Sequence, residues 1–520
     1  MSGLRAALRT APLVLVMGCL SACAPVEPGP ATRPGDESDV DARRALRRTP
    51  LVELFERCSP AVVTITTTWR EAAPPVSQPR SSPRGPARPT PVARVERASG
   101  FVIHPEGFVL TNSHALKKPG TRRVQFHDGR LRRLRVIARD DAHDVALLKI
   151  DAPGPFRALP LGRSDDLLVG EPAIVIGNPF GFGPTLGAGV ITGLGRSTKT
   201  DFTLLRDAIQ TDAGINPGVS GGPLLNRFGE VVGIATSRKD EADGIGFAIP
   251  IDLVRDAFAE TVAAEGRYGF RLGMEVAGRD AATVVAVRRD SPAAEAGVKP
   301  GDVVTRAGWF DVRSGIDYHL ALVGRRGGQE LPLRLLRDGN DVEVDVPLQP
   351  VPPRPADPVA DVKRGLDCEV FAGRWRLLPD FRRRKPVETD TTATFGLGPR
   401  AGRDHFALRF AGYVKVPADG IYQFHVRSDD GSRLYVGEKL VVDNDGLHAE
   451  MERRGFVSLE AGLHSIRLTY FESTGEDALK VSWEGPGIRK REIPASALFR
   501  AKRPRTRPAS QPTQPAEGAD

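Results

Sequence analysis

The sequence predicts a mainly β protein that is divided into several domains. At 520 residues the chain is too long for one hydrophobic core, and its length corresponds to three or so domains. Apolar runs at residues 100–103 and 145–150 are typical of buried strands. Near the C-terminus, Tyr422, Phe424 and Val426 alternate with polar residues, which indicates half-buried antiparallel strands.

The composition is that of a soluble globular protein without a nucleic-acid partner. Hydrophobic residues make up 40% and charged residues 27% of the chain, which are ordinary values. The net charge of +8 is spread widely, apart from a basic tail near residues 502–505. Because the chain has neither a basic helix nor a strip of stacking aromatic residues, nucleic-acid binding is not expected.

A serine lies inside an unusually glycine-rich turn, Asn-Pro-Gly-Val-Ser-Gly-Gly-Pro-Leu, at residues 216–224. Glycines on both sides of Ser220 allow backbone angles that are closed to other residues, so that consecutive N–H groups can point into one hollow. An acyl-transfer serine needs such a hollow, because negative charge develops on the carbonyl oxygen that it attacks.

Two upstream segments supply the partners that a nucleophilic serine requires. His114 follows the apolar run that starts at Gly100, and Asp144 enters an almost wholly apolar strand. The base needs a carboxylate that holds its tautomer, so we assign Ser220 as nucleophile, His114 as general base and Asp144 as orienting carboxylate. Taken singly, each feature has a simpler explanation: His114 as a structural histidine, Asp144 as a turn residue, and the segment around Ser220 as a tight loop. Occurring together in this order, they predict a catalytic triad.

The acidic cluster at residues 140–144 also invites interpretation as a metal site. We reject that interpretation because nothing elsewhere in the sequence completes a ligand set.

The segment from about residue 50 to 260 closely resembles the HtrA family of chymotrypsin-like serine proteases. Besides the three segments above, the resemblance rests on motifs that occur in the family's order, at residues 59–63, 100–103, 176–181, 210–213 and 244–250. It implies two six-stranded barrels in residues 51–260, with the triad in the cleft between them and no cofactor for the chemistry.

By the same resemblance, the backbone N–H groups of Gly218 and Ser220 form the oxyanion hole. Val219 departs from the family, which usually has Asn before the nucleophile, and Ala115 and Gly214 replace the usual Val and Ala. Since the oxyanion hole uses backbone groups, the chemistry should survive, but a stiff β-branched residue changes how easily the loop switches shape.

The first 22 residues have the pattern of an export signal. Arg5 and Arg9 precede a short apolar run, and Leu-Ser-Ala-Cys at residues 20–23 resembles a bacterial lipobox. We expect a lipoprotein signal peptide at residues 1–22, lipidation of Cys23 and a tether at residues 23–50, with an ordinary cleaved signal as the alternative. The protein should then be anchored by lipid in the bacterial cell envelope, on the periplasmic or the surface side.

Two cysteines remain in the body of the protein, Cys58 and Cys368, in different predicted domains. Two are too few for a disulfide scaffold; buried free thiols are favoured, with a Cys58–Cys368 bridge as the alternative. A polar insertion from about Glu71 to Arg94 is rich in Pro, Ser and Arg and predicts a flexible loop.

Residues 266–349 resemble a PDZ domain of the bacterial protease type, through the motifs at residues 284–287, 291–304 and 335–339. The resemblance implies that Leu272, Gly273 and Met274 form the carboxylate-binding loop, where N–H groups take a peptide's C-terminus. A simple hairpin turn at a strand start is the alternative. The stretch that replaces the usual Asn-Gly turn, residues 307–311, leaves the peptide preference open.

After a proline-rich linker at residues 350–362, residues 363–499 resemble a β-sandwich module of the protective-antigen type (PA-fourteen), through motifs at residues 419–422, 428–435, 442–444, 459–464 and 483–487. Some members of that family bind glycans through calcium held by adjacent aspartates, and Asp429 and Asp430 match that position. A hairpin turn that binds no metal is an equal alternative. The tail at residues 500–520 is expected to be disordered.

These observations predict a lipid-anchored envelope serine endopeptidase that degrades unfolded or mislocalised proteins through an acyl-enzyme intermediate. The PDZ domain would capture substrate C-termini, the C-terminal module would bind carbohydrate or surface partners, and family precedent suggests a homotrimer. Two other functions remain open: a non-catalytic adaptor or chaperone on a protease scaffold, and a surface protein that primarily binds glycans.

Overall fold

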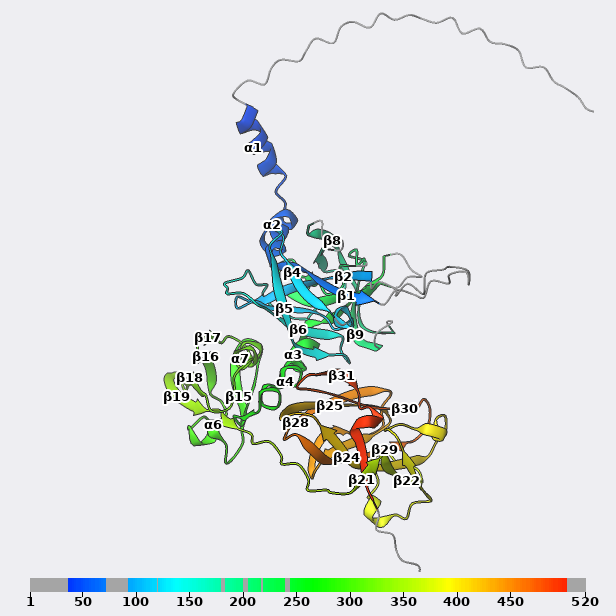
Figure 1. The fold of residues 1–520 in the computed structure, drawn as a ribbon. Helices are drawn as coiled ribbons and strands as arrows, with labels where there is room; N and C mark the ends of the chain where they lie inside the picture. The colour runs from blue at the N-terminus through cyan, green and yellow to red at the C-terminus, as the bar shows by residue number, and fades with distance from the viewer. Residues whose placement is uncertain are drawn as a thin grey trace, which may run out of the picture. The chain divides into compact units, whose positions relative to one another are not determined.

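A computed structural model describes residues 36–71, 92–118, 120–178, 183–199, 204–216, 218–238 and 244–502 (Figure 1). The chain divides into two units, residues 1–53 and residues 54–520. No helix among the described residues is long and apolar enough to cross a membrane. The predicted signal peptide, Cys23 and most of the tail lie outside the described residues.

The first unit contains a helix where the sequence suggested an irregular tether. Helix α1 spans Asp36–Leu46, and α2 begins at Pro50 and continues to Cys58 in the second unit. Arg43 and Arg44 lie in the last turn of α1, where cations interact favourably with the helix dipole. Proline suits the first position of α2 because its missing N–H has no helical partner there.

The second unit opens with a closed six-stranded barrel, as the sequence predicts. Its strands close in the order β1-β2-β3-β6-β5-β4 around an apolar core. They are β1 (Val62–Glu71), β2 (Val92–His104), β3 (Phe108–Asn112), β4 (Thr121–Gln125), β5 (Leu131–Asp140) and β6 (Val145–Ile150). The two ends of the predicted insertion belong to this barrel, because β1 and β2 pair as far as Glu71 and Val92. Residues 72–91 lie outside the described residues.

A second closed barrel follows, with strand order β10-β11-β12-β9-β8-β7. Its strands are β7 (Pro172–Gly177), β8 (Thr185–Lys199), β9 (Leu204–Thr211), β10 (Pro223–Leu225), β11 (Val231–Arg238) and β12 (Gly246–Pro250). The turn that carries Ser220 connects β9 to β10, and Val219 in that turn belongs to the apolar core of this barrel.

Three short helices, α3 (Ile251–Asp256), α4 (Phe258–Val262) and α5 (Ala264–Tyr268), lead to the PDZ fold. Its sheet has the order β14-β15-β16-β18-β19, so that β14 lies at an edge. The elements are β14 (Met274–Ala277), β15 (Ala282–Val287), α6 (Pro292–Glu295), β16 (Val303–Ala307), β17 (Phe310–Asp311), α7 (Gly315–Ala321), β18 (Glu330–Arg337) and β19 (Asn340–Pro347), with β13 (Phe270–Arg271) pairing to β20 (Gln349–Pro350).

The C-terminal region consists of two antiparallel sheets that share one core, which confirms the predicted sandwich. One sheet contains β21 (Val362–Arg364), β22 (Leu366–Ala372), β23 (Glu388–Thr392), β24 (Phe406–Val416), β26 (Ser432–Val436), β27 (Lys439–Asn444), β29 (Gly462–Glu472) and β32 (Leu498–Ala501). The other contains β25 (Gly420–Asp429), β28 (Met451–Leu459), β30 (Ala478–Gly485) and β31 (Ile488–Glu492).

The alternation in β25 is real, but only part of its polar face is exposed: Arg427 is exposed, whereas two other polar residues of that face are buried. Tyr422, Phe424 and Val426 are fully buried, and Gln423 and His425 on the other face are buried as well. His425 compensates for its burial through a contact of 3.2 Å between its Nδ1 and the carboxylate of Glu452 on β28. The predicted half-buried strand is therefore buried on both faces at Gln423 and His425 and exposed at Arg427.

Cys58 and Cys368 are both buried and not joined by a disulfide. Burial raises the pKa of both thiols, that of Cys368 to about 11. The expectation of buried free thiols therefore agrees with the structure.

Candidate active site

His114 and Asp144 lie against each other in the first barrel. His114 follows the end of β3, and its Nδ1 is 2.7 Å from Asp144 Oδ2. The backbone N–H of His114 donates to the other carboxylate oxygen, Oδ1, at 2.8 Å. This second bond fixes the carboxylate relative to the ring. The carboxylate thus selects the tautomer protonated at Nδ1 and leaves Nε2 to act as a base.

The backbone around Asp144 explains how a turn residue reaches the ring. Asp144 has a φ of 55°, in the left-handed region that Asp adopts more readily than most residues. Its carbonyl accepts hydrogen bonds from Asn112 Nδ2 and from the Ser113 N–H, each at 3.1 Å. Because Asn112 and Ser113 directly precede His114, these bonds hold the two turns together.

Ser220 is linked to the same carboxylate through a residue that the sequence did not single out. Ser220 Oγ donates to the backbone carbonyl of Thr236 at 3.0 Å. Thr236 Oγ1 in turn donates to Asp144 Oδ2 at 3.0 Å. Thr236 lies on β11 of the second barrel, so it connects the serine of one barrel to the carboxylate of the other.

The turn around the serine sets the direction of the Ser220 N–H, one of the two predicted oxyanion-hole donors. The carbonyl of Val219 accepts the N–H of Gly222 at 2.8 Å, which turns the Ser220 N–H to the opposite side of that peptide. Gly218, with a φ of 93°, occupies a conformation that favours glycine. Val219 is buried against the barrel core, so the departure from the usual Asn places an apolar anchor there.

The predicted carboxylate-binding loop of the PDZ fold precedes the edge strand β14. Leu272 and Met274 are buried, and Gly273 has a φ of 82°. The N–H of Gly273 donates to Glu265 Oε1 at 3.0 Å, so a carboxylate from α5 already contacts this loop. Glu265 precedes the PDZ motifs, so no sequence motif points to it.

The two aspartates proposed as calcium ligands are joined by a third carboxylate. Asp429, Asp430 and Glu472 are all buried, and one oxygen of each lies within 4.8 Å of the others. Burial, together with the charges of Asp430 and Asp429, raises the pKa of Glu472 to about 7. Glu472 Oε1 is buried, and no group among the described residues donates a hydrogen bond to it. Three hard oxygen donors with one unsatisfied atom fit a cation such as calcium.

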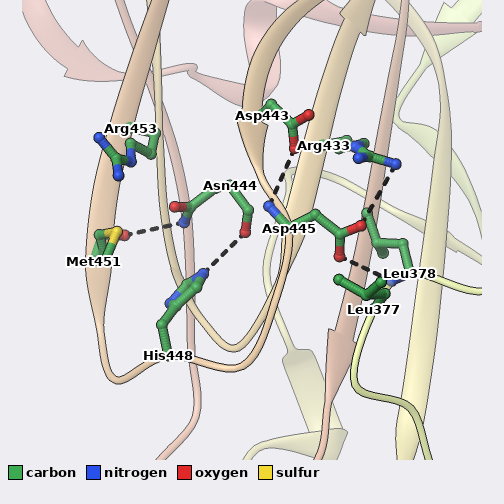
Figure 2. A pocket seen from close by; sticks show the side chains of 9 residues that line it. All are labelled: Leu377, Leu378, Arg433, Asp443, Asn444, Asp445, His448, Met451 and Arg453. Carbon is green, nitrogen blue, oxygen red and sulfur yellow. Dashed lines mark hydrogen bonds and ion pairs between the residues drawn. The ribbon is translucent and has the colours of Figure 1, made fainter.

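A pocket of about 550 Å³ is lined by nine residues, of which one, His448, contacts this acidic cluster (Figure 2). The link is His448, whose backbone N–H donates to Asp430 Oδ1 at 3.1 Å while its Nε2 contacts the Asn444 carbonyl at 2.9 Å. Asp445 accepts the N–H of Leu378 at 2.8 Å. The lining is predominantly polar: Leu377, Leu378, Arg433, Asp443, Asn444, Asp445, His448, Met451 and Arg453.

Three known families match this chain. Residues 98–234 match the family described as trypsin-like peptidase domain, residues 266–348 the PDZ domain, and residues 369–497 the PA14 domain. The HtrA-type protease AlgW solved with a decapeptide is 30% identical, with a TM-score of 0.36, and the match covers 59% of this chain and 100% of that one.

Curated relatives are similar over about half of this chain. A probable periplasmic serine protease, do/HhoA-like, from Haemophilus influenzae is 34% identical over 268 residues, which are 48% of this chain and 58% of that protein. The periplasmic serine endoprotease DegP of Escherichia coli K12 is 36% identical over 268 residues, 48% of this chain and 56% of DegP.

A longer match gives the family. A probable periplasmic serine endoprotease, DegP-like, from Pseudomonas savastanoi pv. phaseolicola is 34% identical over 340 residues, 58% of this chain and 70% of that protein. For the first relatives the chain spans only about 58–64% of their length. With the two barrels and the PDZ fold in place, this similarity shows that the chain belongs to the HtrA/DegP family of trypsin-fold serine proteases, here carrying a C-terminal PA14 domain.

Proposed function

We propose that this protein is a serine endopeptidase of the bacterial cell envelope that cleaves unfolded or mislocalised proteins. The observation that carries the proposal is the pair of contacts made by Asp144, which bonds to His114 Nδ1 at 2.7 Å and to Thr236 Oγ1 at 3.0 Å. Thr236 also holds Ser220, so nucleophile, base and carboxylate belong to one hydrogen-bonded unit.

In this mechanism, Ser220 Oγ attacks the scissile carbonyl while His114 Nε2 takes its proton. The N–H groups of Gly218 and Ser220 stabilise the oxyanion of the tetrahedral intermediate. His114 then gives the proton to the leaving amine, and the C–N bond breaks to form the acyl-enzyme. Water, deprotonated by His114, releases the acid product and restores Ser220. Asp144 stabilises the imidazolium whenever His114 holds the proton.

The test compares the mature protein with its Ser220→Ala variant on casein, an unfolded substrate. Cleavage by the unaltered protein and none by Ser220→Ala would support the serine mechanism. Ser458→Ala, which removes a hydroxyl from β28 of the C-terminal domain, is the matched control and should cleave normally. No cleavage by the unaltered protein, even with peptides that bind the PDZ domain, would favour the adaptor or chaperone.

Envelope location and lipid anchoring are part of the same proposal. Curated relatives bear names that call them periplasmic, and Leu-Ser-Ala-Cys at residues 20–23 predicts lipidation of Cys23. Cys23→Ser should move the protein from the membrane fraction to the soluble fraction. Unchanged membrane retention would refute the anchor and leave the proteolytic proposal unaffected.

A second function, calcium-dependent binding of carbohydrate, is proposed for the C-terminal domain. It is supported by the carboxylates of Asp429, Asp430 and Glu472 and by the polar pocket linked to Asp430 through His448. Calcium bound by these carboxylates would supply a cation for sugar hydroxyls. The pocket in Figure 2, which contacts the cluster through His448, would supply charged groups for hydrogen bonds to the sugar.

Calorimetric titration of the full chain with calcium chloride tests the site. Asp430→Asn and Glu472→Gln should each weaken binding at least tenfold, whereas Asp404→Asn, an exposed acid of the same domain, should not. A glycan array read with calcium and with a chelator then tests the carbohydrate. No calcium binding, or glycan binding that persists in the chelator, would refute this second function.

A further inference from the structure

Ser99 is a fully buried hydroxyl residue near the end of β2, in the first barrel. Its Oγ donates to the carbonyl of Gly218 at 2.7 Å and accepts the N–H of Asn178 at 2.9 Å. Its own N–H donates to the carbonyl of Ser220 at 3.0 Å. One residue of the first barrel therefore holds three points of the second barrel, two of them in the nucleophile turn.

These bonds constrain the peptide planes on both sides of the nucleophile. The Ser99 hydroxyl fixes the plane between Gly218 and Val219, and the Ser99 N–H fixes the plane between Ser220 and Gly221. The plane between them is held by the bond from the Gly222 N–H to the Val219 carbonyl, at 2.8 Å. Each plane is rigid and contains the carbonyl of one residue and the N–H of the next. Fixing the Val219 carbonyl therefore also fixes the direction of the Ser220 N–H.

The fit between Ser99 and the turn is close enough to require glycine. A Cβ on Gly221 would lie 2.2 Å from the carbonyl oxygen of Ser99, and Gly221 has a φ of 86°. That same carbonyl accepts the hydroxyl of Thr111 on β3 at 2.7 Å. The Ser99 backbone is thus anchored from its own barrel while it contacts the turn.

We propose that Ser99 is a positioning residue for acyl transfer, which holds the peptide planes on both sides of the Ser220 N–H and so keeps that donor directed at the developing oxyanion. The proposal rests on the proteolytic function proposed above. A donor is effective only when it is already directed at the position that the oxyanion will occupy, so freeing the Gly218 carbonyl should weaken transition-state binding more than substrate binding.

The alternative is that Ser99 is merely a core residue that joins the two barrels. A core residue would affect stability, and any loss of activity would follow the loss of folded protein. A positioning residue lowers kcat at unchanged KM, since the ground-state substrate does not use the oxyanion hole. The two interpretations therefore predict different measurements on the same variant.

The chain offers a closely matched control for removing a buried hydroxyl. Thr64 on β1 lies directly opposite Ser99 in the strand pairing and is also fully buried. Its hydroxyl has no hydrogen-bond partner among the described residues. Thr64→Val therefore removes a hydroxyl from the same place in the barrel without removing a bond to the nucleophile turn.

The experiment measures casein-derived peptide hydrolysis and inhibition by a peptidyl boronic acid, which forms a tetrahedral adduct with the serine. Ser99→Ala should lower kcat about 10- to 100-fold with KM within twofold, and should weaken the boronate in proportion. Ser99→Cys, which fills the site with a weak donor, should remain impaired. Thr64→Val should behave like the unaltered protein.

Hydrogen exchange supplies a readout that does not need turnover. In Ser99→Ala, peptides covering residues 216–224 should exchange faster while the rest of both barrels is unchanged. Normal kcat and boronate affinity in Ser99→Ala, full recovery in Ser99→Cys, or an equal loss in Thr64→Val would each overturn the proposal. If the unaltered protein cleaves nothing, the proteolytic function fails, and unchanged exchange in Ser99→Ala would separately overturn the role of Ser99.

Discussion

Thr236 donates its hydroxyl to Asp144 across the two barrels, at 3.0 Å from Oδ2, while its carbonyl accepts the Ser220 hydroxyl. Asp144 is almost completely buried, so each hydrogen bond to its carboxylate replaces hydration that it lost on folding. Thr236 thereby contributes twice to the proposed acyl-transfer site, once through its side chain and once through its backbone.

Thr236→Val keeps the shape of the side chain and the backbone carbonyl but removes the hydroxyl bond to Asp144. A hydrogen bond to a charged group contributes about 1.5–3 kcal/mol, so we expect kcat/KM to fall about tenfold or more. Peptide hydrolysis under single-turnover conditions measures this. Thr67 lies on β1, and its buried hydroxyl has no hydrogen-bond partner among the described residues. Thr67→Val should therefore have no effect. Normal turnover in Thr236→Val would show that the bond is dispensable.

Val219→Asn restores the residue that is usual in the family but places an amide in the apolar core of the second barrel. Burying an amide without partners costs about 1–3 kcal/mol, so the unfolding temperature of the protease region should fall by several degrees. Val95→Asn on β2, where the side chain is 50% exposed, is the control and should change little. An unchanged unfolding temperature in Val219→Asn would mean that the amide finds a partner in the turn.

The residues recognised from sequence share one property: each lies in a short motif. His114, Asp144 and Ser220 are flanked by distinctive neighbours, whereas Thr236 lies in an ordinary apolar strand 16 residues after Ser220. Ser99 immediately precedes the motif that begins at Gly100. Its role depends on two carbonyls from another barrel, and no local pattern encodes such a contact.

The same limit applies to Glu472 and to helix α1. Glu472 ends β29, and its sequence neighbours show no metal-binding pattern, but the sheet brings it beside Asp430. The segment that contains α1 is rich in Pro, Gly and charge when averaged, which suggested a tether. Its helical part, Asp36–Leu46, contains neither proline nor glycine. The composition averaged over the whole tether therefore did not indicate a helix. The barrels and the sandwich were expected because motifs that resemble known families recur along these regions, not because of the pattern of any single strand.

Asp302→Asn should destabilise the PDZ fold in a pH-dependent way. Arg337 contacts both carboxylate oxygens of the buried Asp302, at 2.6 and 2.7 Å, and this bond lowers the pKa of Asp302 below its ordinary value of 3.8. A depressed folded-state pKa contributes stability above the ordinary value and loses it as the pH falls through the folded-state pKa. The difference in unfolding temperature between Asp302→Asn and the unaltered protein should therefore be large at pH 7 and shrink towards pH 3.

Differential scanning calorimetry of the full chain measures both pH values. Asp345→Asn on β19 removes an exposed carboxylate of the same fold, and its effect should be small at either pH. A destabilisation by Asp302→Asn that is the same at pH 3 and pH 7 would show that the Arg337 contact does not favour the ionised carboxylate.

Glu265→Ala should increase the affinity of the PDZ domain for peptides with a free C-terminus. Glu265 Oε1 accepts the N–H of Gly273 at 3.0 Å, in the loop expected to bind a peptide carboxylate. A peptide must displace this internal carboxylate before it can bind, and that competition reduces its apparent affinity. Removing the competitor should tighten binding of a fluorescent decapeptide with a free apolar C-terminus about tenfold, measured by anisotropy.

Two controls separate competition at Gly273 from a general charge effect. Glu330→Ala, which removes an exposed carboxylate at the start of β18, changes the net charge equally and should leave peptide affinity unchanged. The same decapeptide with an amidated C-terminus should bind the Glu265→Ala and unaltered proteins equally weakly, because it carries no carboxylate to compete for the N–H. Equal affinity of both proteins for the free-acid peptide would show that breaking the hydrogen bond between Glu265 and Gly273 costs no free energy. The contact would then not restrain peptide capture.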